Sequence, residues 1–392
     1  MTNPKILIVD DEPFNVEYLE QELDELNYDT VAAINGQDAL DKMRSETPDL
    51  ILLDIMMPVM DGFEVLSRLK KDPTTHDIPV IVISADNNMQ SVVKGIQMGA
   101  EDYLPKPFEP TLLYARISSC LEKKHLRDLQ QLYLKGLERE MDIARDIQMS
   151  FLPSELPKVD GWEISAYFKA AREVAGDFYD VFIIPDGNLV CVIGDVCGKG
   201  VGAALFMTLF RSLIRATSTS DVSCSGIDMK ALTPAERLQH VISFTNHYIT
   251  ETHGDANMLF STVFIGIFNH QNGTLTYMNC GNEPPLLLGK EGAVTALLPT
   301  GPVVGVIPDV RFSVKEIPME INDLLLAFTD GIPDALNMDN ISFGNERLQK
   351  LLSSDEKTPK ALLNNIADQL HQFTGDTDQF DDITILAVKR VP

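Results

Sequence analysis

The sequence predicts a multidomain protein with a doubly wound α/β domain, a helical linker and an α+β domain. Three observations predict it. Short β-branched runs alternate with amphipathic stretches over residues 5–120, which indicates a five-stranded parallel sheet covered by helices on both faces. Residues 109–151 carry a helical pattern, and strands joined by tight turns follow residue 153. We place the segments at residues 1–122, 123–150 and 151–392 of a 392-residue chain.

Polar residues end several strand candidates of the first segment. The candidates are KILIVDD, DTVAAI, PDLILLDI, IPVIVISA and DYLPKPF. Parallel strands place their binding groups at their carboxyl ends, where Asp10, Asp11, Asp54, Ser84 and Lys106 fall. Three carboxylates at one edge require a cation, and Mg²⁺ prefers such oxygen ligands. With Lys106 neutralising an incoming phosphoryl group, Asp54 is the best placed nucleophile.

VDD, LLDIMMPVMDG, VISA and the KPF segment resemble the receiver domain of bacterial two-component response regulators over residues 4–122. The resemblance implies a sensor histidine kinase as partner and Asp54 as phosphoacceptor. It also implies that Lys106 contacts the phosphoryl group and that the Lys106-Pro107 peptide is cis. The implied Mg²⁺ ligands are Asp11, Asp54 and the carbonyl of Met56, supported by Asp10, and the implied switch pair is Ser84 and Tyr103.

The linker segment has two interpretations. Leu134, Leu137, Met141 and Ala144 recur at steps of three and four among charged residues, which is the seam spacing of a coiled coil. A coiled coil here would make the protein a parallel homodimer. Alternatively, the helix lies on one of its own domains. Two prolines in FLPSELP end the helical pattern.

Strands and hairpin signals fill the last segment. Apolar or alternating runs occur in WEISAYFKAA, GDFYDVFIIPDGNLVCVIGDV, STVFIGIFNHQNGTLTYMNCG and DDITILAVKR, with turns at Asp186-Gly187 and Asn272-Gly273. Helical stretches are expected at residues 203–218, 234–252 and 359–373. This mixture predicts antiparallel sheets packed against helices.

The stretch VCVIGDVCGKGVG is not a phosphate-binding loop of the Walker type, because its glycine spacing is too short and it contains Asp195. Asp195 needs partner carboxylates, which occur beside glycines or at strand ends. Oxygen-only coordination of this kind favours Mg²⁺ or Mn²⁺, and two such ions can activate a shared water for attack on a phosphate ester. The candidate ligands are Asp177, Asp195, Asp330, Asp381, Asp382 and the carbonyl of Val196.

GDFYD, GDVCGKG, FTDG and DDIT, in this order, resemble the metal-dependent PP2C-type serine/threonine phosphatases of the bacterial branch that includes RsbU and SpoIIE. The resemblance implies a β-sandwich flanked by helices that binds two Mn²⁺ or Mg²⁺ ions. It implies metal binding by Asp177, Asp195, Asp330 and Asp381, with Asp195 bridging the ions and Asp382 as a possible further ligand. The chain departs from the branch at CGNEPP, where Asn282 follows a glycine that usually precedes histidine.

Two functions follow from the resemblances. The first is a response regulator whose phosphatase acts on a phosphorylated anti-anti-sigma (STAS-type) protein in a sigma-factor partner-switching pathway. The alternative is an inactive adaptor, similar to the RssB regulators, that binds a sigma factor. Such adaptors have lost metal ligands, whereas all four carboxylates are present in this sequence, so the sequence favours the enzyme.

Composition excludes other classes of partner. The chain has 58 acidic and 32 basic residues, a formal charge of −26, which argues against binding nucleic acid or an anionic membrane. With no signal-peptide pattern and no long apolar run, we expect a cytoplasmic protein. The five scattered cysteines signal neither disulfides nor a zinc site.

Overall fold

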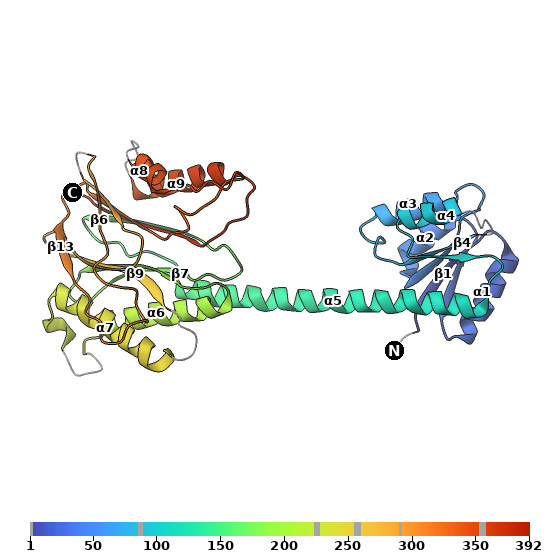
Figure 1. Ribbon diagram of the computed structural model, residues 1–392, viewed down its shortest axis with the longest axis horizontal. Coiled ribbons are helices and arrows are strands. Elements are labelled where there is room, and N and C mark those ends of the chain that lie inside the picture. The colour runs from blue at the N-terminus through green and yellow to red at the C-terminus, as the bar shows by residue number, and fades with distance from the viewer. Residues whose placement is uncertain (1–2, 85–88, 223–227, 255–259, 290–291, 353–357) are drawn as a thin grey trace. The chain divides into compact units, whose positions relative to one another are not determined.

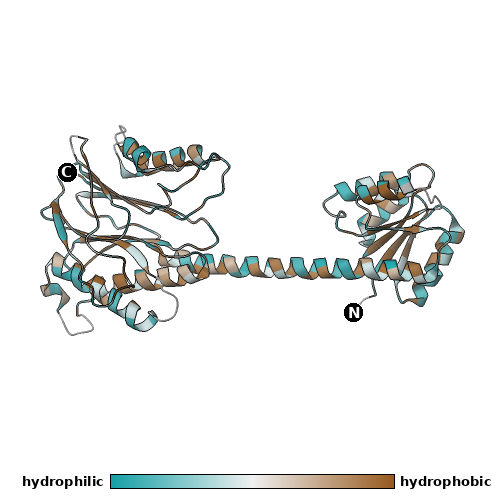
Figure 2. Cartoon of the chain, in the orientation of Figure 1, coloured by the Kyte–Doolittle hydropathy of each residue, from teal (hydrophilic) through white to brown (hydrophobic). Residues whose placement is uncertain are grey.

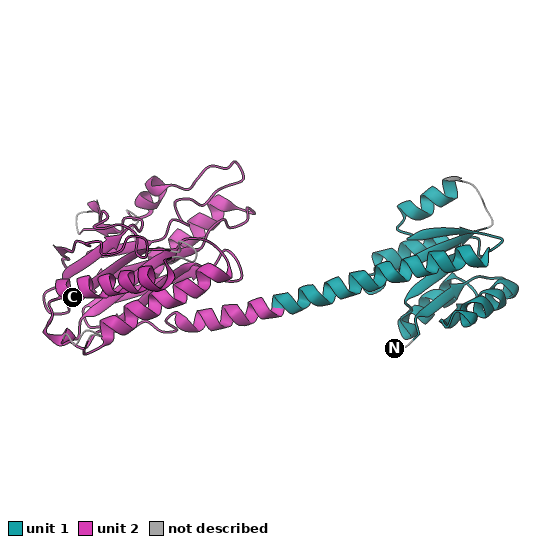
Figure 3. Cartoon of the chain, turned by 60° about the horizontal axis from the view of Figure 1, so that its bottom comes forward, with its two compact units in different colours: residues 1–138 teal, residues 139–392 magenta. Residues whose placement is uncertain are grey.

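The computed structural model describes residues 3–84, 89–222, 228–254, 260–289, 292–352 and 358–392, so that Cys224 lies outside the described residues. The chain forms two compact units, Met1–Glu138 and Arg139–Pro392, which Figure 3 colours separately. The units divide inside one long helix, between the boundaries that we place at residues 122 and 150. Those boundaries remain predictions.

The first unit is built on a five-stranded parallel sheet in the order β2-β1-β3-β4-β5. This order confirms the predicted doubly wound arrangement. Helices α1 and α5 pack on one face of the sheet, and α2 and α3 pack on the other (Figure 1). The elements are β1 (Lys5–Val9), α1 (Pro13–Glu25), β2 (Asp29–Ala33), α2 (Gly36–Glu46), β3 (Leu50–Asp54), α3 (Gly62–Lys71), β4 (Val80–Ser84), α4 (Met89–Gln97) and β5 (Asp102–Pro105).

Local sequence explains these elements. β3 and β4 are buried along their whole length, so they consist of continuous apolar runs rather than alternating ones. In β1, Leu7 faces the core under α2 and α3, whereas its neighbour Ile6 faces the core under α1 and α5. Asn35 and Asp61 cap α2 and α3, because each side chain accepts a hydrogen bond from a backbone N–H three residues later.

Helix α5 (Pro110–Phe151) is continuous over 42 residues. Its first turns pack on the sheet of the first unit through Leu113 and other buried residues. In the middle of the helix, which Figure 2 shows in mixed colours, Leu134 and Leu137 are exposed and Met141 and Ala144 are half-buried. The coiled-coil seam and the helix lying on its own domain both remain predictions.

The second unit is a sandwich of two antiparallel sheets, in the orders β13-β10-β9-β8-β7 and β12-β11-β14-β15-β6. This confirms the predicted α+β class. The elements are β6 (Trp162–Lys169), β7 (Asp177–Ile183), β8 (Leu189–Val196), α6 (Val201–Thr219), η1 (Met229–Ala231), α7 (Pro234–His253), β9 (Ser261–Phe268), β10 (Thr274–Cys280), β11 (Leu286–Leu288), β12 (Val294–Ala296), β13 (Lys315–Pro318), β14 (Leu324–Phe328), α8 (Asn345–Leu352), α9 (Pro359–Thr374) and β15 (Ile383–Arg390).

Three apolar cores hold the sandwich together. Between the sheets, Trp162, Phe264 and Phe268 pack with Leu325 and Leu386. A second core lies under α6 and α7, which cover the outer face of one sheet, and a third lies under α8 and α9 on the other sheet (Figure 1). None of the helices in the described part of the chain combines the length and apolar composition needed to cross a membrane.

Candidate functional site

The first cluster of carboxylates lies at the carboxyl edge of the parallel sheet. Asp10 and Asp11 follow β1, and Asp54 ends the neighbouring strand β3. One carboxylate oxygen from each of the three lies within 4.8 Å of the others. Asp10 and Asp54 are buried, and Asp11 is half-buried. Three oxygen donors this close together fit a hard divalent cation such as Mg²⁺.

Lys106 provides the positive charge of this site. Its Nζ donates hydrogen bonds to Oδ2 of Asp54 at 2.6 Å and to Oδ2 of Asp10 at 2.7 Å. Burial opposes the charge on the ammonium, but the hydrogen bonds and the charges of the two carboxylates outweigh it and raise the pKa of Lys106. The lysine therefore stays charged. The Lys106-Pro107 peptide is cis, as the resemblance implied.

Other predicted residues surround this lysine. Ser84 is fully buried at the end of β4 and is the register partner of Pro105, next to Lys106. Tyr103 is half-buried in β5 and packs against the core under α2 and α3. The backbone N–H of Met56 donates to Oδ1 of Asp54 at 3.1 Å. The roles of these residues remain predictions.

The second cluster lies at one end of the sandwich and receives residues from both sheets. Asp177 begins β7 and is the register partner of Asp195 in β8. Asp330 follows β14, and Asp381 precedes β15, which pairs with β14. Among the described residues, no three of these carboxylates come as close together as those of the first cluster.

Two threonines connect the sheets at this cluster. Oδ2 of Asp177 accepts hydrogen bonds from Oγ1 of Thr329 at 2.7 Å and from Oγ1 of Thr384 at 2.6 Å. Thr329 precedes Asp330, and Thr384 lies two residues after Asp382 in strand β15 of the opposite sheet. The two hydroxyl groups therefore fix the orientation of a buried carboxylate across the sandwich.

Burial, together with neighbouring carboxylates, raises the pKa of three aspartates in this cluster. Burial, followed by the charges of Asp330 and Asp381, raises the pKa of Asp195 to about 7. Burial and Asp381 raise the pKa of Asp330 to about 6. Burial and Asp195 raise the pKa of Asp177 well above its ordinary value. Several buried or half-buried carboxylates close to one another have the oxygen donors and the charge that suit divalent metal ions.

Both carboxylate oxygens of Asp382 accept hydrogen bonds from backbone N–H groups. Its Oδ1 accepts a hydrogen bond from the N–H of Ala171 at 2.8 Å, and its Oδ2 accepts one from the N–H of Gly176 at 2.7 Å. Gly331 lies so close to the carbonyl of Asp382 that an added Cβ would be 1.9 Å from that oxygen. Asp382 and this glycine bring together the segments that carry Asp177, Asp330 and Asp381.

The GKG loop between β8 and α6 reaches the same cluster. Nζ of Lys199 lies 3.0 Å from Oδ2 of Asp381 and donates to the carbonyl of Phe380 at 2.6 Å. The ammonium also lies 4.0 Å from the centre of the Phe380 ring. Gly198 and Gly200 have φ angles of 102° and 77°, which favour glycine. The lysine of the loop thus meets a carboxylate rather than a phosphate.

Sequence reasoning missed Gln148 and the two threonines at this cluster, and it noted Asn282 without giving it a contact. Gln148 at the end of α5 is buried, accepts a hydrogen bond from the N–H of Ala175 at 2.9 Å and donates one to its carbonyl at 2.7 Å. Nδ2 of Asn282, at the position where the branch usually has histidine, donates to the carbonyl of Phe328 at 3.1 Å. Thr329 and Thr384 belong to the motifs FTDG and DDIT, so the sequence did indicate that they lie near the cluster. No sequence signal marked the glutamine.

Comparisons with known proteins match both units. Residues 6–118 match the response regulator receiver domain, and residues 185–391 match stage II sporulation protein E (SpoIIE). Protein IcfG of Synechocystis sp. is 40% identical over 268 residues, which cover 65% of this chain and 42% of IcfG. Response regulator PleD of Caulobacter vibrioides is 43% identical over 124 residues, which cover 32% of this chain and 27% of PleD. The chain therefore spans less than half the length of either relative.

A solved structure shares the fold of the second unit. The SiaA-PP2C domain of Pseudomonas aeruginosa aligns with a TM-score of 0.54 at 20% sequence identity, covering 66% of this chain and 99% of that domain. At this identity the similarity establishes the fold alone.

Proposed function

Because the chain belongs to the stage II sporulation protein E (SpoIIE) family and carries a response regulator receiver domain ahead of that region, we propose that phosphorylation of Asp54 controls a metal-dependent protein serine/threonine phosphatase. The main support for phosphatase activity is a cluster of carboxylates from both sheets. Asp177 and Asp195 come from one sheet, and Asp330 and Asp381 come from the other. The raised pKa values of Asp195 and Asp330 support it, because burial and neighbouring carboxylates make their negative charge costly, and a bound cation would offset that cost.

In the phosphatase unit, Asp177, Asp195, Asp330, Asp381 and the carbonyl of Val196 would hold two Mn²⁺ or Mg²⁺ ions. Bound ions of this kind lower the pKa of a shared water and neutralise a phosphate ester. Neighbouring residues of the chain orient the metal-binding carboxylates. Thr329 and Thr384 fix Asp177, and Asp382 fixes the segment that precedes it.

In the receiver unit, the carboxylate of Asp54 attacks the phosphorus of a phosphohistidine on a sensor histidine kinase. The P–O bond forms as the P–N bond breaks, and the imidazole leaves with the electron pair. Lys106 neutralises the phosphoryl oxygens, while Asp10, Asp11, Asp54 and the carbonyl of Met56 would hold Mg²⁺. Ser84 and Tyr103 would respond to the new phosphoryl group.

Helix α5 is the proposed connection between phosphorylation and catalysis. Within the second unit, Gln148 holds both backbone groups of Ala175, and Nε of Arg145 donates to the carbonyl of Glu173 at 2.9 Å. The segment held in this way leads directly into Asp177. A shift of the helix would therefore move a carboxylate of the metal site. We expect phosphorylation to activate the enzyme.

The proposed substrate is a phosphoserine or phosphothreonine on an anti-anti-sigma (STAS-type) protein in a sigma-factor partner-switching pathway. The proposed assembly is a homodimer through α5. The exposure of Leu134 and Leu137 supports this, because a second copy of the helix would cover them. Light scattering tests the dimer, and a monomer at micromolar concentration in both phosphorylation states would contradict it.

Phosphate release from a phosphoserine protein tests the function. The full chain is assayed with Mn²⁺, with and without a small-molecule phosphodonor, beside Asp54→Asn. We expect Mn²⁺-dependent turnover that the donor changes about 5- to 150-fold in the wild type only. Release of no phosphate with saturating Mn²⁺ would favour the adaptor that binds a sigma factor, and equal responses of the two proteins would show that the units are not coupled.

A further inference from the structure

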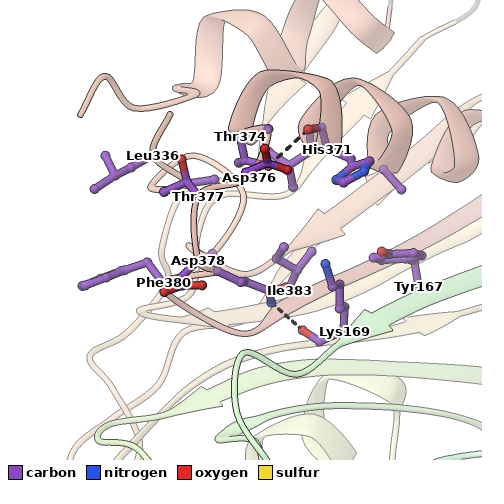
Figure 4. A pocket seen from close by; sticks show the side chains of 16 residues that line it. Tyr167, Lys169, Leu336, His371, Thr374, Asp376, Thr377, Asp378, Phe380 and Ile383 are labelled. Carbon is purple, nitrogen blue, oxygen red and sulfur yellow. Dashed lines mark hydrogen bonds between the residues drawn. The ribbon is translucent and has the colours of Figure 1, made fainter. Parts of the chain in front are cut away.

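A cavity of about 290 Å³ lies beside the second carboxylate cluster, under the segment that joins α9 to β15 (Figure 4). Its wall includes Gly331 and Phe380, the chain neighbours of Asp330 and Asp381. The remaining wall comes from the second half of α9, from β6, from the segment 375–379, from Ala335 and Leu336 after β14, and from Ile383 of β15. The cavity therefore adjoins two of the proposed metal ligands without containing them.

Apolar and acidic side chains both line the cavity, and we call the apolar ones the floor and the exposed charged ones the rim. Leu336, Leu370 and Ile383 supply apolar surface, and the exposed carboxylates of Asp376 and Asp378 lie on the rim. In the part of the chain that the structure describes, neither carboxylate forms an ion pair. The rim also contains Lys169 and His371, so with a neutral histidine the four rim side chains carry a net charge of −1 (two carboxylates against one ammonium).

Two further side-chain oxygens in the wall have no hydrogen-bond partner among the described residues. Oγ1 of Thr377 and Oε1 of Gln379 are buried and lack hydrogen-bond partners among the described residues. The amide nitrogen of Gln379 donates to the carbonyls of Lys169 and Asp381, which sets its oxygen as the free acceptor. Unpartnered acceptors together with two carboxylates suit a ligand that is rich in N–H donors.

The volume limits the size of that ligand. Sites for small organic molecules usually measure about 300–1,000 Å³, so this cavity falls at their lower limit and is suited to a single side chain. Lysine and arginine combine an apolar stem, which the floor would cover, with a cationic end, which the rim would meet. No other common side chains match both surfaces.

We propose that this cavity binds a lysine or arginine that flanks the phosphorylated residue of the protein substrate. The proposal rests on the proposed function and makes Asp376 and Asp378 specificity-determining residues. The cavity selects the sequence around the phosphoserine, and the carboxylates of the metal site act on the phosphate itself.

The test uses the full-length protein with Mn²⁺ and phosphoserine peptides that differ at one flanking position at a time. Each position carries arginine, leucine or glutamate, and kcat/KM is measured for every peptide. We expect one position at which arginine exceeds glutamate by about fivefold, the effect of a partly exposed ion pair. The preference is the ratio of kcat/KM for two peptides measured with the same protein. Differences in absolute activity between protein variants therefore cancel.

Two variants examine the cavity. Asp376→Asn/Asp378→Asn should abolish the preference for arginine, and Ala367→Leu should reduce it by filling the cavity from α9. The control Asp160→Asn/Asp186→Asn, which neutralises two exposed carboxylates outside the cavity, should retain the preference. Circular dichroism and thermal unfolding establish that each variant folds.

Each outcome decides the proposal. Equal rates at every position, a preference for leucine, or a preference that survives both cavity variants would overturn the binding site while leaving the phosphatase intact. If the protein hydrolyses neither the peptides nor an aryl phosphate, the proposed function fails instead. Hydrolysis of the aryl phosphate with no difference among the peptides overturns the binding site alone.

Discussion

The two carboxylate clusters differ in how their negative charge is compensated. In the receiver unit, one lysine donates to two of three carboxylates, at 2.6 and 2.7 Å. In the phosphatase unit, Lys199 pairs with the outermost carboxylate only, at 3.0 Å, and the pKa values of Asp195 and Asp330 rise to about 7 and 6. The first cluster carries its own counter-charge, whereas the proposed function of the second requires cations from solution.

The difference matches the two proposed reactions. A nucleophilic carboxylate has to remain ionised and accessible to phosphorus, and a neighbouring ammonium favours both its ionisation and the approach of phosphate. A site for two metal ions has to leave its charge uncompensated until the ions arrive. Acidic residues at the ends of strands therefore do not by themselves define a chemistry.

The largest expected effect comes from Asp195→Asn, which removes the central charge of the second cluster at nearly constant volume. We expect Mn²⁺-dependent phosphate release to fall by several orders of magnitude. Phosphorylation of Asp54 by a small-molecule donor should be unchanged, because it uses the other cluster. Asp160→Asn, which changes an exposed carboxylate outside the cluster, is the control, and comparable turnover of both variants would contradict the proposed metal site.

The second prediction concerns pH and metal binding in the second cluster. The folded-state pKa of Asp195, about 7, exceeds its ordinary value of 3.8, so its ionisation costs stability as pH rises between these values. In EDTA, we expect the free energy of unfolding of the phosphatase unit to fall between pH 5 and about 7.5 by a few kcal/mol at most. Mn²⁺ replaces the protons, so its stabilising effect should grow over the same range.

Thermal unfolding with EDTA or Mn²⁺ at each pH measures this effect. Asp195→Asn serves as the control, since it removes the group with a pKa of about 7 and should reduce the pH dependence, while Asp330, with a pKa of about 6, still titrates. A stabilisation by Mn²⁺ that is equal at pH 5 and pH 7.5 would show that protons and metal ions do not compete in this cluster.

The third prediction concerns the contact between α5 and the segment that precedes Asp177. Gln148→Leu leaves the N–H and carbonyl of Ala175 without their partners and frees the segment. Loss of such outer contacts typically weakens metal binding about 10- to 100-fold. Mn²⁺ titration by calorimetry is the measurement. Gln131→Leu, on an exposed part of the same helix, should bind Mn²⁺ as the wild type does.

The smallest effect is expected from Lys199→Met. Its ammonium competes with a metal ion for Asp381, so removing it should strengthen Mn²⁺ binding by up to about fivefold, the range of a partly exposed ion pair. Lys158→Met, which changes an exposed lysine elsewhere, is the control. Weaker binding by Lys199→Met would show instead that the lysine holds Asp381 in a binding orientation.

Much of the fold could be predicted because it depends on local patterns. The strands β1, β3 and β4 are apolar runs that end at polar residues, and α6, α7 and α9 lie within two residues of their predicted ranges. The strands β11, β12 and β13 have only three or four residues each, too few to show a period. Helix α8, with eight residues, was also missed.

The candidate sites could be predicted only as sets of residue types. Aspartates beside glycines pointed to carboxylate clusters, but their hydrogen-bond partners lie far away in the chain. Thr384 is 207 residues from Asp177, and Asp382 is 206 residues from Gly176. Asn282 likewise meets the carbonyl of Phe328 only because β14 ends beside it. Such partners follow from tertiary packing, which no spacing in the sequence encodes.

In the hairpin of β7 and β8, the strand register determines whether two of the proposed metal ligands lie next to one another. Asp177 and Asp195 are opposite one another because the turn at residues 184–188 sets the pairing, with the N–H of Ile184 donating to the carbonyl of Asn188 at 3.0 Å. A slip of one residue would direct the two side chains to opposite faces of the sheet. An insertion of one residue in this turn that shifts the register of the strands would therefore abolish the site, although every aspartate would still be present. In this chain, the length of a surface turn therefore matters to the proposed metal site as much as the presence of the acidic residues.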